Sequence, residues 1–182
     1  AAELQHPRLA ADFTRLRAEL HIALDEWKEA EQLYADMLAT RPMAWAHLGL
    51  ARTLFEQQRH EEAQEALLQL VETYPRFMAA YDLLAQNHEA MGQQIQAKKV
   101  LEDAVAISPH MLGRLRHLGG IAYDTGDIGA AERAYKQVVS KAKYSEFRDP
   151  EDHVNLVRAL VKKGDAPQAS GVLRDMERSL RG

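Results

Sequence analysis

The sequence predicts an all-α fold made of repeated helix pairs, and two observations lead to that prediction. Apolar residues recur at spacings of three and four, which places them on single faces of short helices, and no strand-like alternation competes. The same pattern returns about every 34 residues, so that Pro75 and Pro109 are 34 positions apart. Five such units cover nearly all of the 182 residues.

The period can be followed residue by residue. Leu50, Ala51, Leu54, Ala63, Leu67, Leu70 and Pro75 correspond one for one to Leu84, Ala85, His88, Ala97, Leu101, Ala104 and Pro109. Leu118, Gly119, Ala122, Ala131, Tyr135 and Val138 follow 34 positions later, and Leu156, Val157, Leu160, Ala169, Leu173 and Met176 follow 38 positions after those. Upstream, Ala18, His21, Ala30, Tyr34, Met37 and Pro42 fit a first unit. We expect units near 8–42, 43–76, 77–110, 111–144 and 150–182, all within a single domain of residues 1–182.

Each unit is expected to hold two helices. The predicted pairs are 8–24 with 27–40, 43–57 with 60–73, 77–91 with 94–107, 111–124 with 127–141, and 150–163 with 166–180. The paired helices can approach closely because a small residue recurs on the second helix of every pair, at Ala30, Ala63, Ala97, Ala131 and Ala169.

The helix ends have their own signals. Gly92, Gly126 and Gly164 lie between paired helices, where a left-handed residue commonly ends a helix. Pro42, Pro75 and Pro109 lie at the joins between units. The run 149–152, Asp-Pro-Glu-Asp, is typical of an N-cap, a first-turn proline and two acids that favour a helix N-terminus.

The interval of 38 residues marks four additional residues between the fourth and fifth units. Residues 141–148 occupy that junction and are basic, with two aromatic residues. One interpretation is a long helix end followed by a packed loop. The other is a loop that contacts a partner, because insertions in repeat proteins usually lie on an exposed face.

The pattern resembles the tetratricopeptide repeat (TPR), a 34-residue helix–turn–helix unit with the consensus W-x2-L-G-x2-Y, then A-x3-F, then P. The resemblance implies a right-handed α-α superhelix whose first helices line a concave groove that binds a protein or peptide. Carried over to this sequence, the groove residues include Trp45, Leu48, Arg52, Phe55, Asp82, Gln86, Glu89, Arg116, Tyr123, Asp124, Arg158 and Lys162.

These groove residues divide into an apolar and a basic group. Trp45, Leu48 and Phe55 would form an apolar anchor, and the basic residues farther along would suit a peptide with acidic groups beyond its anchor. Because Arg52, Arg116 and Arg158 occupy comparable places in three units, we expect them on one continuous surface. The alternative is that the apolar group is buried between units and that the charges are only solvated.

No pattern in the sequence predicts catalysis. The chain has no cysteine, no His-Glu-x-x-His motif and no Gly-rich phosphate loop. We therefore predict a non-enzymatic protein with no catalytic residue, no metal site and no cofactor.

Charge and hydropathy restrict the partners. Residues 1–91 carry 8 basic and 15 acidic side chains, whereas residues 92–182 carry 15 basic and 12 acidic ones, within a net charge of -4. The basic second half leaves a nucleic-acid-associated helical solenoid adaptor as an alternative function, although the net charge makes nucleic acid an unlikely partner. No apolar run approaches the roughly 20 residues that span a bilayer, so no membrane association is expected.

Three runs resemble the repeat region of bacterial response regulators, in which a receiver domain precedes TPR repeats. They are residues 45–52, 81–85 and 148–152. The resemblance implies the output region of a cytoplasmic two-component signalling protein, with an N-terminal receiver domain in the full-length chain.

The two terminal helices carry apolar side chains that a neighbouring repeat would normally cover. At the start these are Leu9, Phe13, Leu16 and Leu20, and at the end they are Val172, Leu173, Met176 and Leu180. We therefore expect a homodimer that buries at least one of the two terminal surfaces.

Overall fold

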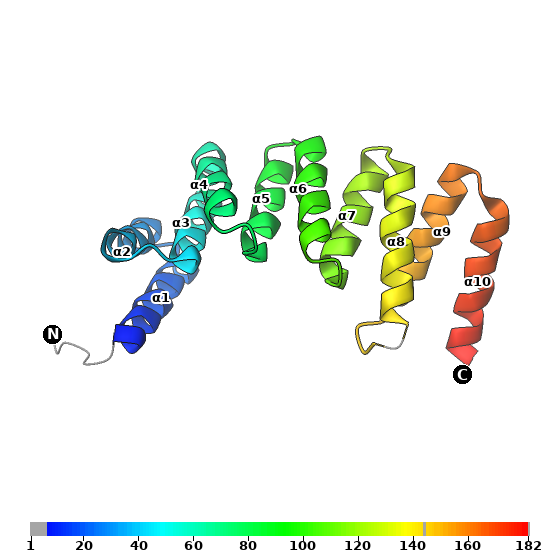
Figure 1. Ribbon diagram of the computed structural model, residues 1–182, viewed down its shortest axis with the longest axis horizontal. Helices are drawn as coiled ribbons and strands as arrows, with labels where there is room; N and C mark the ends of the chain where they lie inside the picture. The colour runs from blue at the N-terminus through cyan, green and yellow to red at the C-terminus, as the bar shows by residue number, and fades with distance from the viewer. Residues whose placement is uncertain (1–6, 144, 182) are drawn as a thin grey trace. The chain divides into compact units, whose positions relative to one another are not determined.

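The computed structural model describes residues 7–143 and 145–181, and this part of the chain contains all of the predicted helices and no strand (Figure 1). The helices are α1 (Pro7–Ala23), α2 (Trp27–Thr40), α3 (Ala44–Glu56), α4 (His60–Thr73), α5 (Met78–Ala90), α6 (Gln94–Ile107), α7 (Leu112–Asp124), α8 (Ile128–Ala142), α9 (Pro150–Lys163) and α10 (Ala166–Arg181). Every boundary lies within one residue of its predicted position. The all-α helical-repeat prediction is confirmed.

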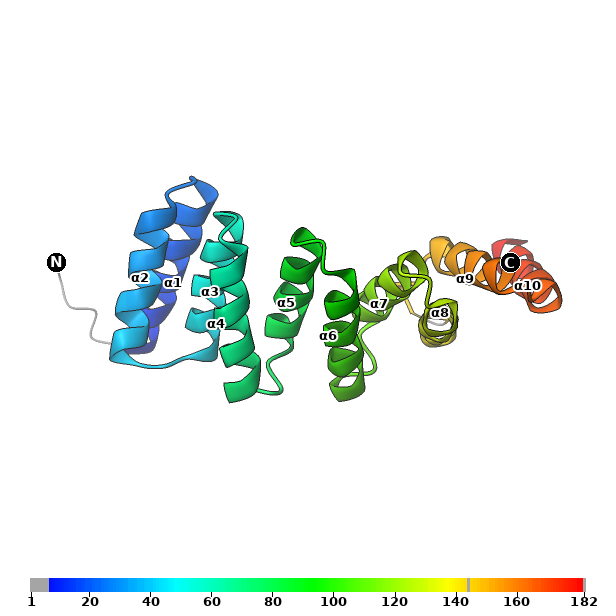
Figure 2. The same ribbon diagram turned by 90° about the horizontal axis from the view of Figure 1, so that it is seen from above.

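The helices form two compact units, Ala1–Gly92 and Gln93–Gly182. The first unit contains α1 to α5 and the second contains α6 to α10, so the division falls between the two helices of the third predicted repeat (Figures 1 and 2). Within each unit, every helix packs against the next one along the chain. The single domain predicted for residues 1–182 remains a prediction.

Small side chains lie where the helices approach each other. Ala30, Ala63, Ala97, Ala131 and Ala169 are all at most 4% exposed, which confirms their predicted packing role. In the second unit, one core cluster connects α7, α8, α9 and α10; its residues are Ala122, Ala130, Ala131, Tyr135, Leu156, Ala159, Leu160 and Ala169.

The turns inside the helix pairs each contain one residue in the left-handed region. Gly92, Gly126 and Gly164 have φ angles of 72°, 82° and 87°, as the sequence predicts. Asp25 and Gln58 occupy the same place in the first two pairs, with φ angles of 58° and 60°. The first two turns therefore adopt the same conformation with residues for which it is less favourable.

Helices α8, α9 and α10 of the second unit each begin with a capping side chain; for α10 it is the Asp165 carboxylate, which accepts from the Gln168 amide at 3.1 Å. The Asp149 carboxylate accepts a hydrogen bond from the Glu151 amide at 2.9 Å, and Pro150 is the first residue of α9, as predicted. The Asp127 carboxylate caps α8 by accepting from the Ala130 amide at 3.0 Å. Asp127 also pairs with Lys98 of α6 at 2.5 Å, and the pKa of Asp127 is lowered mainly by this hydrogen bond and next by the cap.

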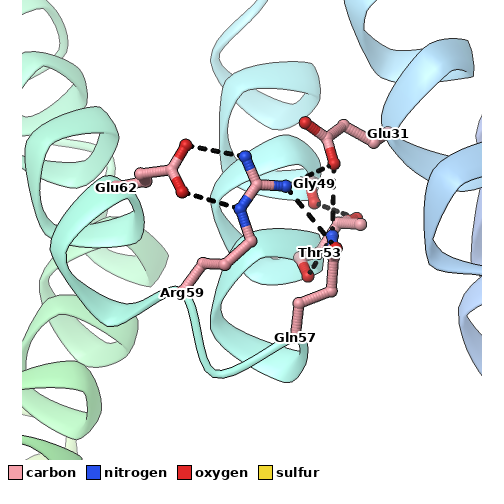
Figure 3. A network of polar contacts seen from close by, with 6 residues as sticks. All are labelled: Glu31, Gly49, Thr53, Gln57, Arg59 and Glu62. Atoms are coloured by element: carbon pink, nitrogen blue, oxygen red, sulfur yellow. Dashed lines mark hydrogen bonds and ion pairs between the residues drawn. The ribbon is translucent and has the colours of Figure 1, made fainter.

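A polar network in the first unit connects three helices (Figure 3). The Arg59 guanidinium donates to both carboxylate oxygens of Glu62, at 2.7 and 2.6 Å, and to Glu31 of α2 at 2.7 Å. Gln57 donates to the same Glu31 oxygen at 3.2 Å and to the Thr53 carbonyl in α3. These contacts fix the turn between α3 and α4 against the preceding helix pair.

Candidate functional site

The candidate site lies in the second unit, where α7, α8 and α9 meet. The Lys162 ammonium group stands 4.2 Å from the centre of the Tyr123 ring and 3.4 Å from the Tyr123 carbonyl oxygen. The guanidinium of Arg158, one turn before Lys162 on α9, contacts the side chains of Glu151 and Asn155, at 3.2 and 3.1 Å. Two groove residues predicted from the sequence, Tyr123 and Lys162, are therefore in direct contact.

Tyr123 and Arg158 line the same pocket, which we call the α7–α9 pocket. It has a volume of about 200 Å³ and is lined by Gly120, Tyr123, Asp124, Tyr135, Asn155 and Arg158. Both cationic and anionic groups lie on its wall, together with two phenols and an amide. Such a wall can donate hydrogen bonds to a ligand and also accept them.

Tyr135 is the most deeply buried of these residues, with 6% of its surface exposed. Burial raises its pKa, as does the nearby charge of Asp124, and the charge of Arg158 opposes the rise. The phenol is therefore a neutral hydroxyl donor at neutral pH. No described residue forms a hydrogen bond with its hydroxyl group, and the hydroxyl oxygen is accessible from the pocket.

The pocket is open because Gly120 has no side chain. A Cβ atom at Gly120 would meet only the Tyr135 hydroxyl, at an ordinary contact distance of 3.9 Å. At the adjacent Gly119 a Cβ atom would lie 2.7 Å from the Tyr135 ring. Close packing against Tyr135 therefore explains why residue 119 is a glycine. Packing does not require Gly120, and a helical glycine without a packing reason costs stability.

The side chain of Arg116 is fixed in position by hydrogen bonds within the protein. Its guanidinium binds both oxygens of Asp152 at 2.7 and 2.8 Å, and it also donates to the Phe147 carbonyl at 2.7 Å. Asp152, which the sequence pattern explains as a favourable first-turn acid, is thus the partner of a predicted groove residue. The binding of a ligand by Arg116 remains a prediction.

The apolar groove residues of the first unit partly belong to its packing. Trp45 is half-buried against the core cluster of Ala18, Tyr34 and Ala46, and Arg15 lies 5.9 Å from the centre of its ring. Phe55 meets the His60 ring edge to face, with centroids 5.4 Å apart. Leu48 is half-buried as well, so these three side chains form part of the packed surface.

The remaining predicted groove residues of the first unit have exposed or half-buried side chains. Arg52 is exposed and approaches Glu56 only at 3.9 Å. On α5, Gln86 is exposed, and Asp82 and Glu89 are half-buried with partners of their own. The role of all four residues in a groove remains a prediction.

The terminal helices expose the apolar side chains that the sequence singled out. Leu9, Phe13, Leu16 and Leu20 of α1 are each more than half exposed. On α10, Leu173 is exposed and Val172 packs against the core cluster, whereas the side chain of Leu180 lies outside the described residues. The homodimer expected from these surfaces remains a prediction.

Sequence reasoning missed three residues of the α7–α9 pocket. Gly120 has a usable signal, since the second glycine of a pair inside a predicted helix has no place in the repeat pattern. The repeat pattern gives Tyr135 only a helix-packing position, and Asn155 has no distinguishing pattern in the sequence.

Over residues 7–143 and 145–181, histidine and acidic side chains nowhere gather in a group of three that could hold a metal ion. None of the helices in the same residues combines the length and the apolar character that crossing a bilayer requires.

Comparisons with known proteins support the repeat pattern. Residues 41–86 and 79–111 match two sequence models of the tetratricopeptide repeat. No curated protein matches the chain.

Similar solved structures cover most of the chain. A crystal structure of the MamA protein matches with a TM-score of 0.71 at 17% identity, over 91% of this chain and 88% of that one. MamA of Desulfovibrio magneticus RS-1, from residue 41 to its end, has a TM-score of 0.69 at 16% identity, over 94% and 95% of the chains. The kinesin light chain TPR-like repeats of Podospora anserina reach 0.68 at 22% identity, over 96% of both. Residues 41–111 are therefore similar to tetratricopeptide repeats, and the described chain shares the all-α helical-repeat fold of these solved structures.

Proposed function

We propose that the chain is a non-catalytic scaffold that binds a peptide or protein segment on the surface formed by α7 and α9, with the α7–α9 pocket as its centre. The observation that carries the proposal is the Tyr135 hydroxyl, which has no hydrogen-bond partner among the described residues and is accessible from a pocket that packing alone would not keep open. A hydroxyl group with no partner inside the protein is available to form a hydrogen bond with a ligand.

The surroundings of the pocket favour a peptide. Tyr123, with Lys162 over its ring, offers an aromatic surface, and Arg158 adds an exposed cation beside it. Tyrosine and arginine are the residue types most often found at binding hot spots. A peptide amide can accept from Tyr135 or Arg158 and donate to Asp124, so the mixed polarity of the wall suits a polypeptide backbone or an amide side chain.

The test is selection from a random displayed library of 12-residue peptides, followed by affinity measurements on purified variants. Gly120→Leu places a side chain into the pocket, and we expect it to weaken the selected peptides at least about tenfold, equivalent to about 1.4 kcal/mol. Arg158→Ala should weaken them as well. Gly171→Leu is the matched control, because Gly171 is also helical and a Cβ atom there meets nothing within 4 Å.

Peptides that bind the Gly120→Leu and Arg158→Ala variants as tightly as the original protein would contradict the proposal. Nucleic-acid binding with a steep dependence on salt, and no peptide selected, would favour the alternative of a nucleic-acid adaptor.

The proposal extends to a signalling context. The runs 45–52, 81–85 and 148–152 support the output region of a bacterial, cytoplasmic two-component response regulator. The expected finding is a receiver domain encoded ahead of Ala1 in the full gene. A different domain at that place would contradict the signalling role. The scaffold role would still be decided by the peptide-binding experiment.

A further inference from the structure

The four additional residues between the fourth and fifth repeats help to form a second cavity in the second unit. This cavity, which we call the junction pocket, has a volume of about 570 Å³. Its lining residues are His110, Met111, Leu112, Gly113, Arg116, Lys141, Ser145 and Phe147. They come from the turn before α7, the first turns of α7, the end of α8 and the loop that leads to α9.

The loop beside the pocket is tied to the helices on both sides. Arg116 of α7 donates to the Phe147 carbonyl while it holds Asp152 of α9. Within the loop, the Phe147 amide donates to the Ser145 hydroxyl at 3.1 Å, and the Ser145 amide donates to the Ala142 carbonyl at 2.9 Å. The backbone around the pocket is therefore determined by specific contacts.

Two large apolar side chains on this fixed frame face solvent. Phe147 is 65% exposed and Met111 is 55% exposed, and both line the junction pocket. The loop is held through backbone and hydroxyl groups, so the exposed Phe147 ring is not needed for its closure. Aromatic and methionine side chains exposed beside a cavity are typical of interaction sites.

The rim of the pocket carries one positive charge that has no carboxylate partner. Lys141 donates to the Pro109 carbonyl and to the Gln137 side chain at 3.2 Å. Among the described residues, no acidic side chain pairs with it. The charge of Arg116, in contrast, is balanced by Asp152. A negative group next to the cavity would therefore find Lys141 available for an ion pair.

We propose that the junction pocket binds a large apolar side chain of a partner protein segment that carries a carboxylate directly beside it. The inference rests on the proposed scaffold function and specifies the chemistry of its partner at a place separate from the α7–α9 pocket. Charge complementarity to Lys141 selects an acidic segment, and the cavity volume accepts a phenylalanine or leucine side chain.

The experiment uses the full 182-residue chain and three synthetic peptides. The peptides are Gly-Ser-Asp-Phe-Asp-Ser-Gly, the same sequence with lysine for both aspartates, and the same sequence with alanine for phenylalanine. Binding is followed by the backbone amide signals of Gly113, Ser145 and Phe147 in two-dimensional NMR of labelled protein. We expect the first peptide to shift these signals, the lysine peptide to bind about fivefold more weakly, and the alanine peptide about tenfold more weakly.

Two variants link the binding to the pocket. Gly113→Leu fills it without a clash, because a Cβ atom at Gly113 meets nothing within 4 Å, and should abolish the shifts. Lys141→Gln should remove the preference for the acidic peptide over the lysine peptide. Gly171→Leu again serves as the matched control and should bind like the original protein.

Three outcomes would overturn the inference. They are equal binding of the acidic and lysine peptides, shifts that persist in Gly113→Leu, and a dimer in sedimentation equilibrium that Gly113→Leu dissociates, which would mean that a second copy fills the pocket. If the peptides fail here while selected peptides still depend on Gly120 and Arg158, this inference fails and the proposed function stands.

Discussion

The guanidinium of Arg116 in α7 donates two hydrogen bonds, of 2.7 and 2.8 Å, to the carboxylate of Asp152 in α9. The Asp152 side chain is only 4% exposed, whereas that of Arg116 is 32% exposed. The pKa of Arg116 is raised, chiefly by its hydrogen bond to Asp152. Because the pair joins two consecutive repeats and also holds the loop through Phe147, its first role is to position α9.

The first prediction concerns this pair. Arg116→Gln or Asp152→Asn should each lower the free energy of unfolding by about 2 kcal/mol, because each leaves a largely buried polar group without its partner. Urea denaturation at pH 7 measures the loss. The double variant should cost clearly less than the sum of the two, and strictly additive losses would mean that the pair contributes no coupling.

The second prediction uses two adjacent glycines of α7. Gly119→Ala should destabilise the protein by about 1–3 kcal/mol, because the new methyl group would lie 2.7 Å from the Tyr135 ring. Gly120→Ala should stabilise it by about 0.5–1 kcal/mol, because alanine favours the helix and has room at this position. Thermal and urea denaturation of the two variants check the difference, and effects of the same sign would refute it.

The third prediction concerns the turn between α3 and α4. Gln58 has a φ angle of 60°, a conformation that costs a residue with a side chain roughly 1–2 kcal/mol. Gln58→Gly should therefore stabilise the protein by about 0.5–1 kcal/mol after the greater flexibility of unfolded glycine is subtracted. Gln64→Gly, in the middle of α4, is the control and should destabilise by about 1 kcal/mol. A loss of stability in Gln58→Gly in urea denaturation would contradict the strain argument.

The fourth prediction is a dependence on pH. Glu132 accepts hydrogen bonds from Lys136 and Lys163, each at 2.6 Å, and these bonds lower its pKa below the ordinary value of 4.5. A lowered folded-state pKa means that the carboxylate stabilises the protein above pH 4.5 and that this contribution is lost as the pH falls through the folded-state pKa.

Glu132→Gln should consequently be less stable than the original protein at pH 7, by roughly 2 kcal/mol, and the gap should close in acid. Urea denaturation of both proteins between pH 7 and pH 3 measures it. A gap that stays constant over this range would exclude the ion pairs as its source.

Most of the fold could be predicted because each rule that determines it is local. The alanine at each helix crossing, the glycine at three turns and the Asp149 cap all act within one repeat, so their spacing carries the information. The left-handed Asp25 and Gln58 show the limit of this signal, since their turns follow the repeat geometry without its usual residue.

The site was less predictable because it depends on contacts between repeats. The repeat pattern predicts Arg116 on the inner helix face, but it does not reveal that Asp152, 36 residues away, forms an ion pair with Arg116. Likewise, a tyrosine at the packing position of α8 looks like a core residue until Gly120 is seen to leave its hydroxyl uncovered. Contacts between neighbouring repeats follow from three-dimensional placement, which spacing alone does not give.

The ion pairs of the second unit affect how this unit unfolds. Lys98 with Asp127, Arg116 with Asp152 and Lys163 with Glu132 all connect one repeat to the next. In a linear array, strong coupling between neighbours makes partial opening costly, because one lost repeat removes the contacts of its neighbour as well. Fraying from the C-terminal end should therefore be suppressed, and the unit should melt cooperatively, in a single sharp step.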